Sequence, residues 1–560
     1  MSRDLDSQNV VHYLRKNARK TPERTALVEP TESGAESWSF AELEARADWM
    51  AAGLRAEGVR AGDRIIVMVP MSLKLYQVLL GVLELGAVAV FVDPWVGARQ
   101  IASFATYAEP EGFVGVGKSH VVRLFESTLR TLEITVTTGV RIWRIPARRT
   151  WSEVLRYAGP VRLYPSEADD TALITFTSGS SGMPKGADRT HRFLSAQHEA
   201  LNAEFPYGED DVDMPTFPVF SLNNLANGVP TVIPDMDFRR VADTDGGRIL
   251  DQIEAHSVTT ATASPPFFDR LSDALESRGA TGVPLRRILT GGAPVSDEQL
   301  RRWQRLMPDT EVVVIYGSTE AEPVAHIGAA ERLEATSTAG EGSRGFCVGA
   351  PIDAVDARVI PISHKPVVLD EGWSSLELDT GDIGELVVCG DHVCERYFRN
   401  PEATAENKIV EDDGTVWHRM GDTGYFDDHG HFWLTGRVHS TIIRDGEPIQ
   451  AQLVEQSARG DDPRIARLAA VGVPHQQFGS QLVLVVQIVN GEREESVIED
   501  LSRRIERRGI AVDAIVVSDG EIPVDPRHNS KIDYAALRDQ IGAVEKDSIQ
   551  RLDKSSAVRR

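Results

Sequence analysis

Apolar and polar positions alternate between helical and strand-like spacing over most of the chain, up to about residue 435. Helical spacing of the apolar residues predicts amphipathic helices at residues 10–20 and 40–57, and a short apolar run predicts a strand at residues 63–69. Further short apolar runs, each followed by a loop, predict strands at residues 171–176, 231–233, 286–289 and 311–315. Strands that alternate with helices indicate an α/β fold with mostly parallel sheets. Ligands usually bind at the carboxyl ends of such strands, so the loops there are candidate sites.

The most apolar run, residues 78–92, is shorter than a membrane-spanning helix and contains Glu84. We interpret it as the end of a buried helix, a turn at Gly86 and a strand that leads into Asp93. The amino-terminal residues are charged and lack the apolar core of a signal peptide. These observations predict a cytoplasmic protein without a membrane span.

The pattern changes at residues 417–437, a β segment with turn signals at Gly421-Asp422, residues 428–430 and Gly436-Arg437. Beyond it, the spacing predicts a small α+β domain with strands at residues 465–473 and 481–489 and a helix at residues 494–507. The last residues are polar, and we expect them to be frayed. We therefore divide the chain into a large domain (1–435), a hinge (436–440), a small domain (441–545) and a tail (546–560).

Charge and cysteine content exclude several classes of function. The 560 residues include 60 Lys+Arg and 84 Asp+Glu, a formal charge of -24. Nucleic acids and anionic lipids bind basic surfaces, so this balance disfavours both as partners. Three cysteines, Cys347, Cys389 and Cys394, can form neither a disulfide framework nor a four-thiolate metal site. Any site for an anion must therefore be built locally.

The clearest chemical signal is the segment TSGSSGMPKG at residues 177–186, directly after the predicted strand 171–176. Its glycines let backbone N–H groups converge on an anion, its hydroxyls add donors, and Lys185 supplies a positive charge. The spacing differs from a Walker A loop, which has Gly-Lys-Ser/Thr after its first glycine and four more residues. Taken alone, the segment leaves a flexible Ser/Gly surface loop as the alternative. We predict a phosphate-binding loop made by Thr177, Ser178, Gly179, Ser180, Ser181, Gly182 and Lys185.

On this loop and on the motifs that follow it in order, the chain resembles the adenylate-forming superfamily of acyl-CoA synthetases, luciferases and peptide-synthetase adenylation domains. The resemblance covers nearly the whole chain. It implies a large amino-terminal α/β domain, a small mobile carboxyl-terminal α+β domain, and ATP and Mg²⁺ as cofactors. It also implies that a carboxylic acid is activated as an acyl-adenylate.

Two glycine-containing segments follow predicted strands. Gly291, Gly292, Ala293 and Pro294 are similar to the family segment that lies along adenine, with a plain strand-to-helix turn as the alternative. The second segment consists of Tyr316, Gly317, Ser318, Thr319 and Glu320. The resemblance implies that its aromatic ring stacks on adenine, its threonine contacts the α-phosphate and Glu320 binds Mg²⁺, which prefers hard oxygen ligands.

Three further residues match the family near and beyond the predicted hinge. Asp422 matches the carboxylate that binds the two ribose hydroxyls, and Arg437 matches a second ribose contact. Lys531 matches a lysine that swings into the site during adenylation. The resemblance thus assigns catalysis to Lys185, Thr319 and Lys531, which offset the repulsion between two anionic reactants.

Four segments resemble one branch of the superfamily, the olefin β-lactone synthetases: residues 215–220, 232–237, 316–324 and 522–531. Many superfamily members carry a histidine after a Pro-x-Phe segment, and here Ser221 stands at that place. The branch activates a β-hydroxy acid, whose own hydroxyl then attacks the acyl carbon to give a β-lactone without CoA. Such an intramolecular step benefits from effective molarities of about 10⁵ M and above. We expect Phe217, Phe220 and Ser221 to line the acyl pocket.

Two other functions remain open from the sequence. A ligase that forms a thioester with CoA or a carrier protein is one, because Gly446 keeps the small residue found beside the pantetheine tunnel of CoA ligases. A degenerate adenylate-binding regulator is the other, disfavoured because the motif residues are all present together. The base for lactone closure is not identified, with His326, His439 and His528 as candidates by residue type. Association with other enzymes of the same biosynthetic pathway, fatty acid or olefin biosynthesis, also remains open.

Overall fold

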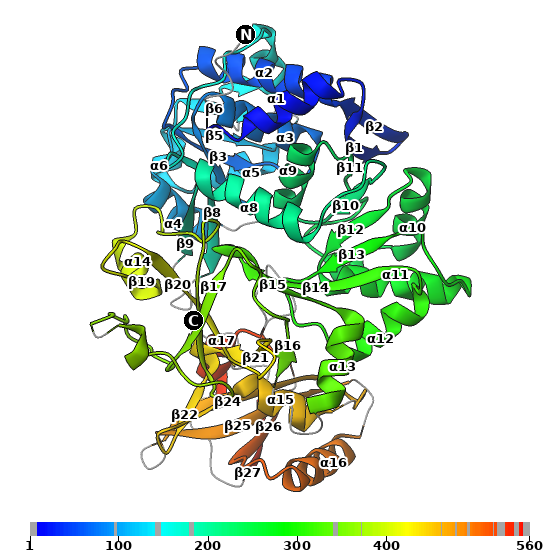
Figure 1. Cartoon of the computed structure of the whole chain (residues 1–560), viewed down its shortest axis with the longest axis vertical. Coiled ribbons are helices and arrows are strands. Elements are labelled where there is room, and N and C mark those ends of the chain that lie inside the picture. Colours follow the sequence, from blue (N-terminus) through cyan, green and yellow to red (C-terminus); the bar gives the residue numbers. More distant parts are fainter. Residues whose placement is uncertain are drawn as a thin grey trace.

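A computed structural model describes residues 8–93, 98–139, 147–178, 184–339, 345–370, 372–460, 462–475, 479–489, 493–518, 520–523, 532–541 and 548–552. Within these residues no helix has the length and apolar character needed to cross a membrane. Figure 1 shows an α/β body above and a smaller carboxyl-terminal unit below. The expected α/β class, with mostly parallel sheets and a small α+β unit, is confirmed. The predicted domain boundaries stay predictions.

Two large sheets form the α/β body, and both are parallel except at their edges. The first has the order β7-β6-β5-β3-β4-β8-β9, in which only β8 and β9 pair antiparallel. Its strands are β3 (Arg64–Met68), β4 (Val88–Phe91), β5 (Gly112–Gly115), β6 (Ile134–Thr137), β7 (Arg149–Thr150), β8 (Thr171–Ser178) and β9 (Pro184–Thr190).

The second large sheet has the order β15-β14-β13-β12-β10-β11-β1-β2, antiparallel at β14–β15 and β1–β2. Its strands are β1 (Thr25–Thr31), β2 (Gly34–Ser39), β10 (Asp213–Pro215), β11 (Thr231–Val232), β12 (Thr260–Ala263), β13 (Arg287–Thr290), β14 (Glu311–Ser318) and β15 (Ala321–Gly328). The predicted strand at 311–315 is three residues short, because the chain continues into a hairpin in which Ser318 pairs with Ala321.

Helices flank these sheets, and their ends follow from local sequence. Helix α2 begins in a capping box, where the Ser39 side chain accepts from the Glu42 N–H and Glu42 accepts from the Ser39 N–H. The helices of the body are α1 (Val11–Lys20), α2 (Phe40–Ala56), α3 (Leu73–Glu84), α4 (Ala98–Ala108), α5 (Gly117–Arg123), α6 (Ser127–Arg130), α7 (Trp151–Val154), α8 (His191–Glu204), α9 (Pro218–Asn227), α10 (Gly246–Ala255), α11 (Pro265–Arg278), α12 (Asp297–Leu306) and α13 (Ala329–Ala339). Short 3₁₀ turns lie at Leu155–Tyr157 and Val241–Asp243.

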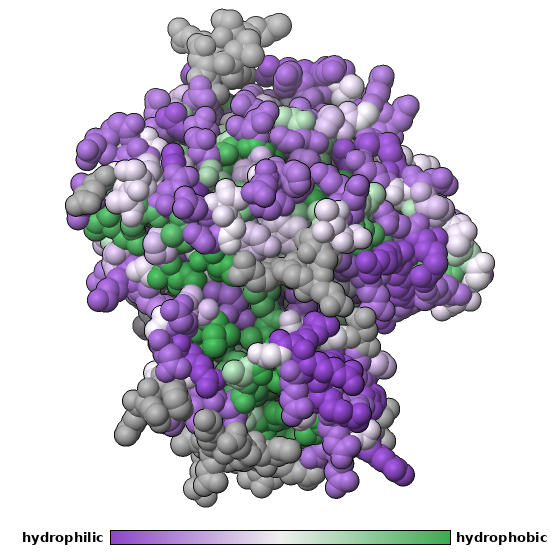
Figure 2. All heavy atoms as spheres, turned by 60° about the horizontal axis from the view of Figure 1, so that its bottom comes forward, coloured by the Kyte–Doolittle hydropathy of each residue, from purple (hydrophilic) through white to green (hydrophobic). Residues whose placement is uncertain are grey.

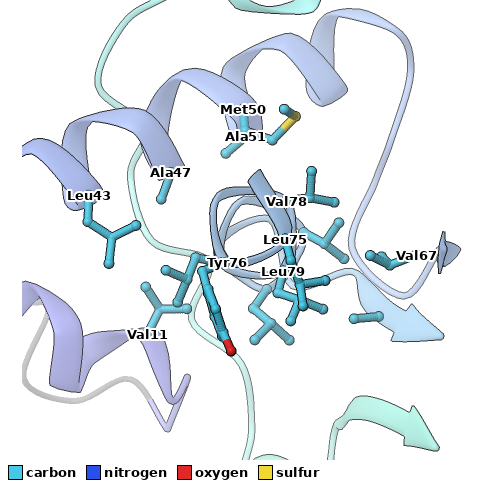
Figure 3. Packing of buried hydrophobic residues seen from close by; sticks show 14 of the residues in the cluster. Val11, Leu43, Ala47, Met50, Ala51, Val67, Leu75, Tyr76, Val78 and Leu79 are labelled. Atoms are coloured by element: carbon cyan, nitrogen blue, oxygen red, sulfur yellow. The ribbon is translucent and has the colours of Figure 1, made fainter. Parts of the chain in front are cut away.

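Helix α3 lies at the centre of the amino-terminal core. It is apolar on every side and buried from Leu75 to Glu84, as expected for a helix enclosed by other elements. Figure 3 shows Tyr76 of α3 beside Val11 of α1, with Met50 and Ala51 of α2 on another side. The run 78–92 therefore forms a buried helix end, a turn at Gly86 and β4, as predicted.

A third sheet is antiparallel throughout, in the order β16-β21-β20-β18-β17 with β19 on β20. Its strands are β16 (Phe346–Cys347), β17 (Asp356–Ile360), β18 (Gly384–Cys389), β19 (Lys408–Val410), β20 (Val416–Phe426) and β21 (Phe432–Arg437), with α14 (Pro401–Asn407) and a 3₁₀ turn (Trp373–Ser375) beside them. The turn signals at Gly421-Asp422 and Gly436-Arg437 were misleading, because both pairs lie within strands. Gly421 has a φ of +65°, and the pairing of β18 with β20 shifts register nearby, so this glycine serves a bulge.

The carboxyl-terminal unit has a four-stranded sheet, β24 (Ile465–His475), β25 (Gly479–Ile488), β26 (Ala514–Ser518) and β27 (Ser548–Leu552). It also contains the hairpin β22 (Ile442–Arg444) and β23 (Glu447–Ile449), with α15 (Ala451–Arg459), α16 (Glu494–Arg507) and α17 (Tyr534–Ile541). A 3₁₀ turn (Val438–Ser440) joins it to β21. The unit rests against the third sheet, where the hydroxyls of Thr423 and Thr441 both donate to Gln450 Oε1.

Figure 2 shows a face on which hydrophilic side chains predominate, with hydrophobic ones in patches near its middle.

Candidate active site

The predicted phosphate loop connects the antiparallel strands β8 and β9, with Thr177 opposite Lys185. Gly179, Ser180, Ser181 and Gly182 lie outside the described residues, and so do the side chains of Thr177 and Ser178. Lys185 is buried, with Nζ 3.8 Å from Glu406 Oε2. Burial lowers the pKa of Lys185, and the nearby Glu406 and Glu320 act in the opposite direction. Its ammonium group therefore lies among carboxylates at the end of this hairpin.

The β14–β15 hairpin presents Tyr316, Gly317, Ser318, Thr319 and Glu320 at the carboxyl end of β14. The Tyr316 hydroxyl donates a 2.7 Å hydrogen bond to Asp422 Oδ2. Arg189 donates a 2.5 Å hydrogen bond to the carbonyl oxygen of Thr319, which fixes the turn. The hairpin thus brings the predicted adenine and phosphate contacts to the same edge of the second sheet.

Asp422 and Arg437 are direct partners on the neighbouring strands β20 and β21. Asp422 Oδ1 accepts from the Arg437 guanidinium, while Oδ2 accepts from Tyr316. The charge of Asp422 raises the pKa of Arg437. A carboxylate has about four lone-pair sites, so Asp422 keeps acceptor capacity for a pair of hydroxyls. The three side chains form one connected cluster, and their roles as adenosine contacts stay predictions.

The glycine pair at the end of β13 is required by close packing. A Cβ at Gly291 would lie 2.4 Å from the carbonyl oxygen of Ile315, and Gly292 has a φ of +76°. Gly292 and Pro294 are exposed, and Ala293 is half-buried. The Phe217 ring lies next to Gly292. This segment therefore runs beside β14 with an accessible outer face, which a flat base could contact.

Glu320 has the properties required of a hard metal ligand. Its Oε1 accepts a 2.8 Å hydrogen bond from the Tyr397 hydroxyl. Burial acts to raise the pKa of Glu320, but His418, the Tyr397 hydroxyl and Lys408 together hold it below its ordinary value. Among the described residues no group of three or more His, Cys, Asp or Glu could hold a metal ion. One ionised carboxylate near Lys185 nevertheless fits Mg²⁺, which usually binds through one or two carboxylates and substrate phosphates.

Helix α9 carries the predicted acyl-pocket residues on one side and lines a separate pocket on another. Phe217 and Phe220 pack in a small apolar cluster, with ring centroids 6.1 Å apart, and Ser221 is fully buried. The neighbouring pocket is small, with a volume of about 70 Å³, and lies between α1, α3, α8 and α9. Its walls are largely aliphatic: Val10, Val11, Tyr13, Leu14, Leu80, Leu83, Leu194, Gln197, His198, Leu201, Val219, Leu222, Asn223, Leu225 and Ala226. No sequence pattern indicated that α1 and α3 contribute to this pocket.

The remaining predicted residues are Lys531 and the three histidines considered as candidate bases. Lys531 and His528 lie outside the described residues. His326 is on β15, and its Nε2 lies 2.9 Å from Glu204 Oε2. His439 lies in the 3₁₀ turn after β21, where Arg437 and Asp422 act on it electrostatically. The structure therefore brings one of the three candidate bases to the Asp422–Arg437 pair.

Comparison with known proteins establishes what kind of enzyme this cluster belongs to. A model of the family described as AMP-binding enzyme matches residues 14–398. This chain belongs to the AMP-binding enzyme family. It is therefore an AMP-forming, acid-activating ligase, and ATP and a small-molecule acid are its expected substrates. Asp422, Arg437 and Lys531 lie beyond the matched residues.

Relatives of this AMP-binding enzyme extend over nearly all of it. An olefin beta-lactone synthetase of Stenotrophomonas maltophilia is 34% identical over 548 residues, which are 94% of this chain and 96% of the relative. A protein of the same description from Xanthomonas campestris is 34% identical over 550 residues, with the same coverage. A feruloyl-CoA synthase of an Amycolatopsis species is 29% identical and covers 87% of this chain and 90% of the relative.

Solved structures show the same fold. ATP-bound MatB from Rhodopseudomonas palustris superposes with a TM-score of 0.76 at 24% identity, over 95% of this chain and 98% of that protein. The o-succinylbenzoate CoA synthetase of Bacillus subtilis, in complex with its acyl-adenylate intermediate, gives a TM-score of 0.74 at 20% identity, over 96% and 99%. These likenesses confirm the fold of the AMP-binding enzyme.

Proposed function

We propose that this AMP-binding enzyme activates a β-hydroxy carboxylic acid as acyl-AMP and closes it to a β-lactone. The observation that carries the proposal is the 34% identity, over 94% of the chain, to two olefin beta-lactone synthetases. The relatives described as CoA ligases or CoA synthases are less similar, at 25–29% identity over 58–87% of the chain. The four sequence segments shared with the β-lactone branch support the same assignment.

In the first step, a carboxylate oxygen of the acid attacks the α-phosphorus of ATP and pyrophosphate leaves. We assign the adenine to Tyr316 and the 291–294 segment, and the ribose hydroxyls to Asp422 and Arg437. Thr319, Lys185 and Lys531 would contact phosphate oxygens, where donors and positive charges offset the repulsion between the two anions. Mg²⁺, bound by Glu320 and phosphate oxygens, would supply further positive charge.

In the second step, the β-hydroxyl oxygen attacks the acyl carbon and the bond from that carbon to the AMP oxygen breaks. AMP leaves, a base takes the hydroxyl proton, and a four-membered ring forms. Holding both reacting groups in one molecule supplies the entropic advantage of an intramolecular reaction. Water must be excluded, because it would hydrolyse the adenylate. His439, on which Arg437 and Asp422 act electrostatically, is our candidate for this base.

The apolar pocket beside α9 is our candidate for the alkyl part of the acid. Gln197 of its wall contacts the chain next to the site. Gln197 Nε2 donates a 2.9 Å hydrogen bond to the carbonyl oxygen of Glu322, two residues after Glu320. His198 Nδ1 and Asn223 Oδ1 lie 2.8 Å apart, so these polar groups satisfy one another. The remaining wall is mostly aliphatic, which favours a saturated chain.

A thioester-forming ligase is the second candidate. Gly446 has a φ of +87°, and a Cβ there would meet nothing within 4 Å. The structure around this glycine therefore leaves space, as a pantetheine arm would require. The relatives described as acyl-CoA ligase and feruloyl-CoA synthase match up to 87% of the chain, which keeps this candidate open.

The two candidates differ in their need for an acceptor. The protein would be incubated with ATP, Mg²⁺ and β-hydroxy acids of several chain lengths, without CoA, while AMP and product masses are followed. We expect stoichiometric AMP and a product with the mass of the acid minus water. Turnover that depends absolutely on CoA would contradict the β-lactone assignment.

A further inference from the structure

A short stretch of chain joins the two parts of the site that would hold the phosphates. We call residues 393–398 the clasp. On one side its backbone is bonded to the β14–β15 turn, where Cys394 N–H donates 2.7 Å to the carbonyl oxygen of Glu320 and Val393 bridges to Ala321. The clasp is thus attached directly to the residue that would bind Mg²⁺.

On its other side the clasp is bonded to the strand that carries Lys185. Phe398 N–H donates 2.8 Å to the carbonyl oxygen of Gly186, and Tyr397 bridges to Ala187. Arg396 accepts a backbone hydrogen bond of 3.2 Å from Asp188. A single segment therefore spans the gap between β9 of the first sheet and β14 of the second.

The side chain of Tyr397 also connects the two parts of the site, through its hydroxyl group and its ring. Its hydroxyl donates 2.8 Å to Glu320 Oε1, and Lys185 Nζ lies over its ring, 5.7 Å from the centroid. Lys408 Nζ lies 5.4 Å from the same centroid and donates to the carbonyl oxygen of Cys394. Tyr397 is only 4% exposed, so its orientation is set by packing. A hydrogen bond to a carboxylate and a cation over a ring are both directional contacts.

We propose that Tyr397 is a positioning residue, which holds the Glu320 carboxylate at a fixed spacing from the Lys185 ammonium group. Tyr397 acts through these two side chains and does not touch the substrate. Its hydroxyl orients the Glu320 carboxylate through the hydrogen bond to Oε1. The proposal rests on the adenylation step of the proposed function and is independent of the group that later captures the acyl carbon.

The test is binding of ATP to Tyr397→Phe, measured by calorimetry at a series of Mg²⁺ concentrations without an acid substrate. The variant keeps the ring and its packing and loses the hydroxyl. We expect the Mg²⁺ concentration needed for half-maximal ATP binding to rise about tenfold, the low end of what a hydrogen bond to a charged group contributes. AMP binding without Mg²⁺ should stay within about twofold of wild type. Unchanged Mg²⁺ dependence, or an equal loss of AMP binding, would overturn the proposal.

Two further variants separate positioning from a general structural effect. Tyr207→Phe is a control, because it removes a partly buried tyrosine hydroxyl that donates 2.8 Å to Asn224, and it should leave the Mg²⁺ dependence unchanged. In the background of Glu320→Gln, adding Tyr397→Phe should produce little further change in Mg²⁺ dependence, because the two residues act as a unit. A Mg²⁺ effect in Tyr207→Phe, or additive effects of Glu320→Gln and Tyr397→Phe, would each show that Tyr397 does not act through Glu320.

Discussion

Asp422 accepts hydrogen bonds from two elements that are far apart in sequence, Tyr316 on β14 and Arg437 on β21. The pairing with Arg437 offsets the cost of placing a carboxylate that is only 5% exposed. The same arrangement fixes the orientation of the carboxylate before a ligand arrives. Less freedom is then lost on binding, which is the general benefit of a preorganised site.

Glu455 of α15 is a half-buried carboxyl group whose titration should affect stability. It accepts hydrogen bonds from the Ala470 N–H and the Tyr534 hydroxyl, and burial raises its pKa to about 8. The folded state therefore binds a proton that the unfolded state releases near 4.5. This stabilisation is complete below the unfolded pKa and is lost as the pH rises through about 8. Between pH 5 and 8 we expect the titration of Glu455 to lower the free energy of unfolding by up to about 1.4 kcal/mol per pH unit. The melting temperature of the wild type should fall with it.

Glu455→Gln should make this slope shallower by the contribution of Glu455, because the amide does not titrate. The exposed Glu499→Gln on α16 is the control and should follow the wild type. Thermal unfolding at four pH values distinguishes them. Parallel pH profiles for wild type and Glu455→Gln would show that Glu455 ionises normally in the folded state.

Among the elements, those with a uniform apolar pattern could be predicted from the sequence. The helix predicted at residues 494–507 has the bounds of α16, and the strand at 465–473 lies within β24. The strand predicted at 481–489 overlaps β25 and ends one residue beyond it. Glycine was a poorer guide, because Gly421 serves a bulge inside β20 rather than a turn. Local sequence reports the spacing along one element and not the register of its partner.

In the candidate site, too, some residue pairs could be predicted from the sequence and others could not. Asp422 and Arg437 could be placed together, because they are 15 residues apart on adjacent strands. Tyr397 and Glu320 are 77 residues apart, and no periodic pattern indicates that they meet. The clasp between two sheets and the pocket wall supplied by α1 likewise depend on packing between distant elements. Motifs thus supplied the candidate ligand contacts, which stay predictions, while the residues that support them required the structure.

The pocket between α1, α3, α8 and α9 leads to a prediction about chain length. Ala226→Phe would fill space at the wall, so kcat/KM for long-chain β-hydroxy acids should fall while that for short ones stays near wild type. Each methylene excluded from the pocket should cost about 0.8 kcal/mol, or roughly fourfold in kcat/KM. Ala203→Phe on the exposed face of α8 is the matched control. A uniform loss for all chain lengths would place the alkyl group elsewhere.

At the scale of the whole molecule, the carboxyl-terminal unit lies against the third sheet close to the candidate ribose site. Asp533 and Arg538 of this unit act electrostatically on His439, beside Arg437. We propose that residues 441–545 move about the 436–440 hinge, so that Lys531 completes the site during adenylation. The strongly negative total charge of the protein repels ATP, and a lysine close to the phosphates would offset part of this repulsion.

Lys531→Ala should therefore lower the rate of adenylation by about 100-fold or more, the range seen when a donor to a transition-state charge is removed. ATP binding should remain within a few-fold of wild type. Pyrophosphate exchange measures the first quantity and calorimetry the second. Adenylation at the wild-type rate would remove Lys531 from the mechanism.

The central claim is that the acid is activated through its carboxylate and captured by its own hydroxyl. The most direct measurement uses a β-hydroxy acid with ¹⁸O in both carboxylate oxygens, with ATP and Mg²⁺ and without CoA, analysed by mass spectrometry. We predict one ¹⁸O atom in the released AMP and one in a β-lactone product. Unlabelled AMP would exclude an acyl-adenylate, and labelled AMP that is accompanied only by the free acid would show that water, rather than the hydroxyl, takes the acyl group.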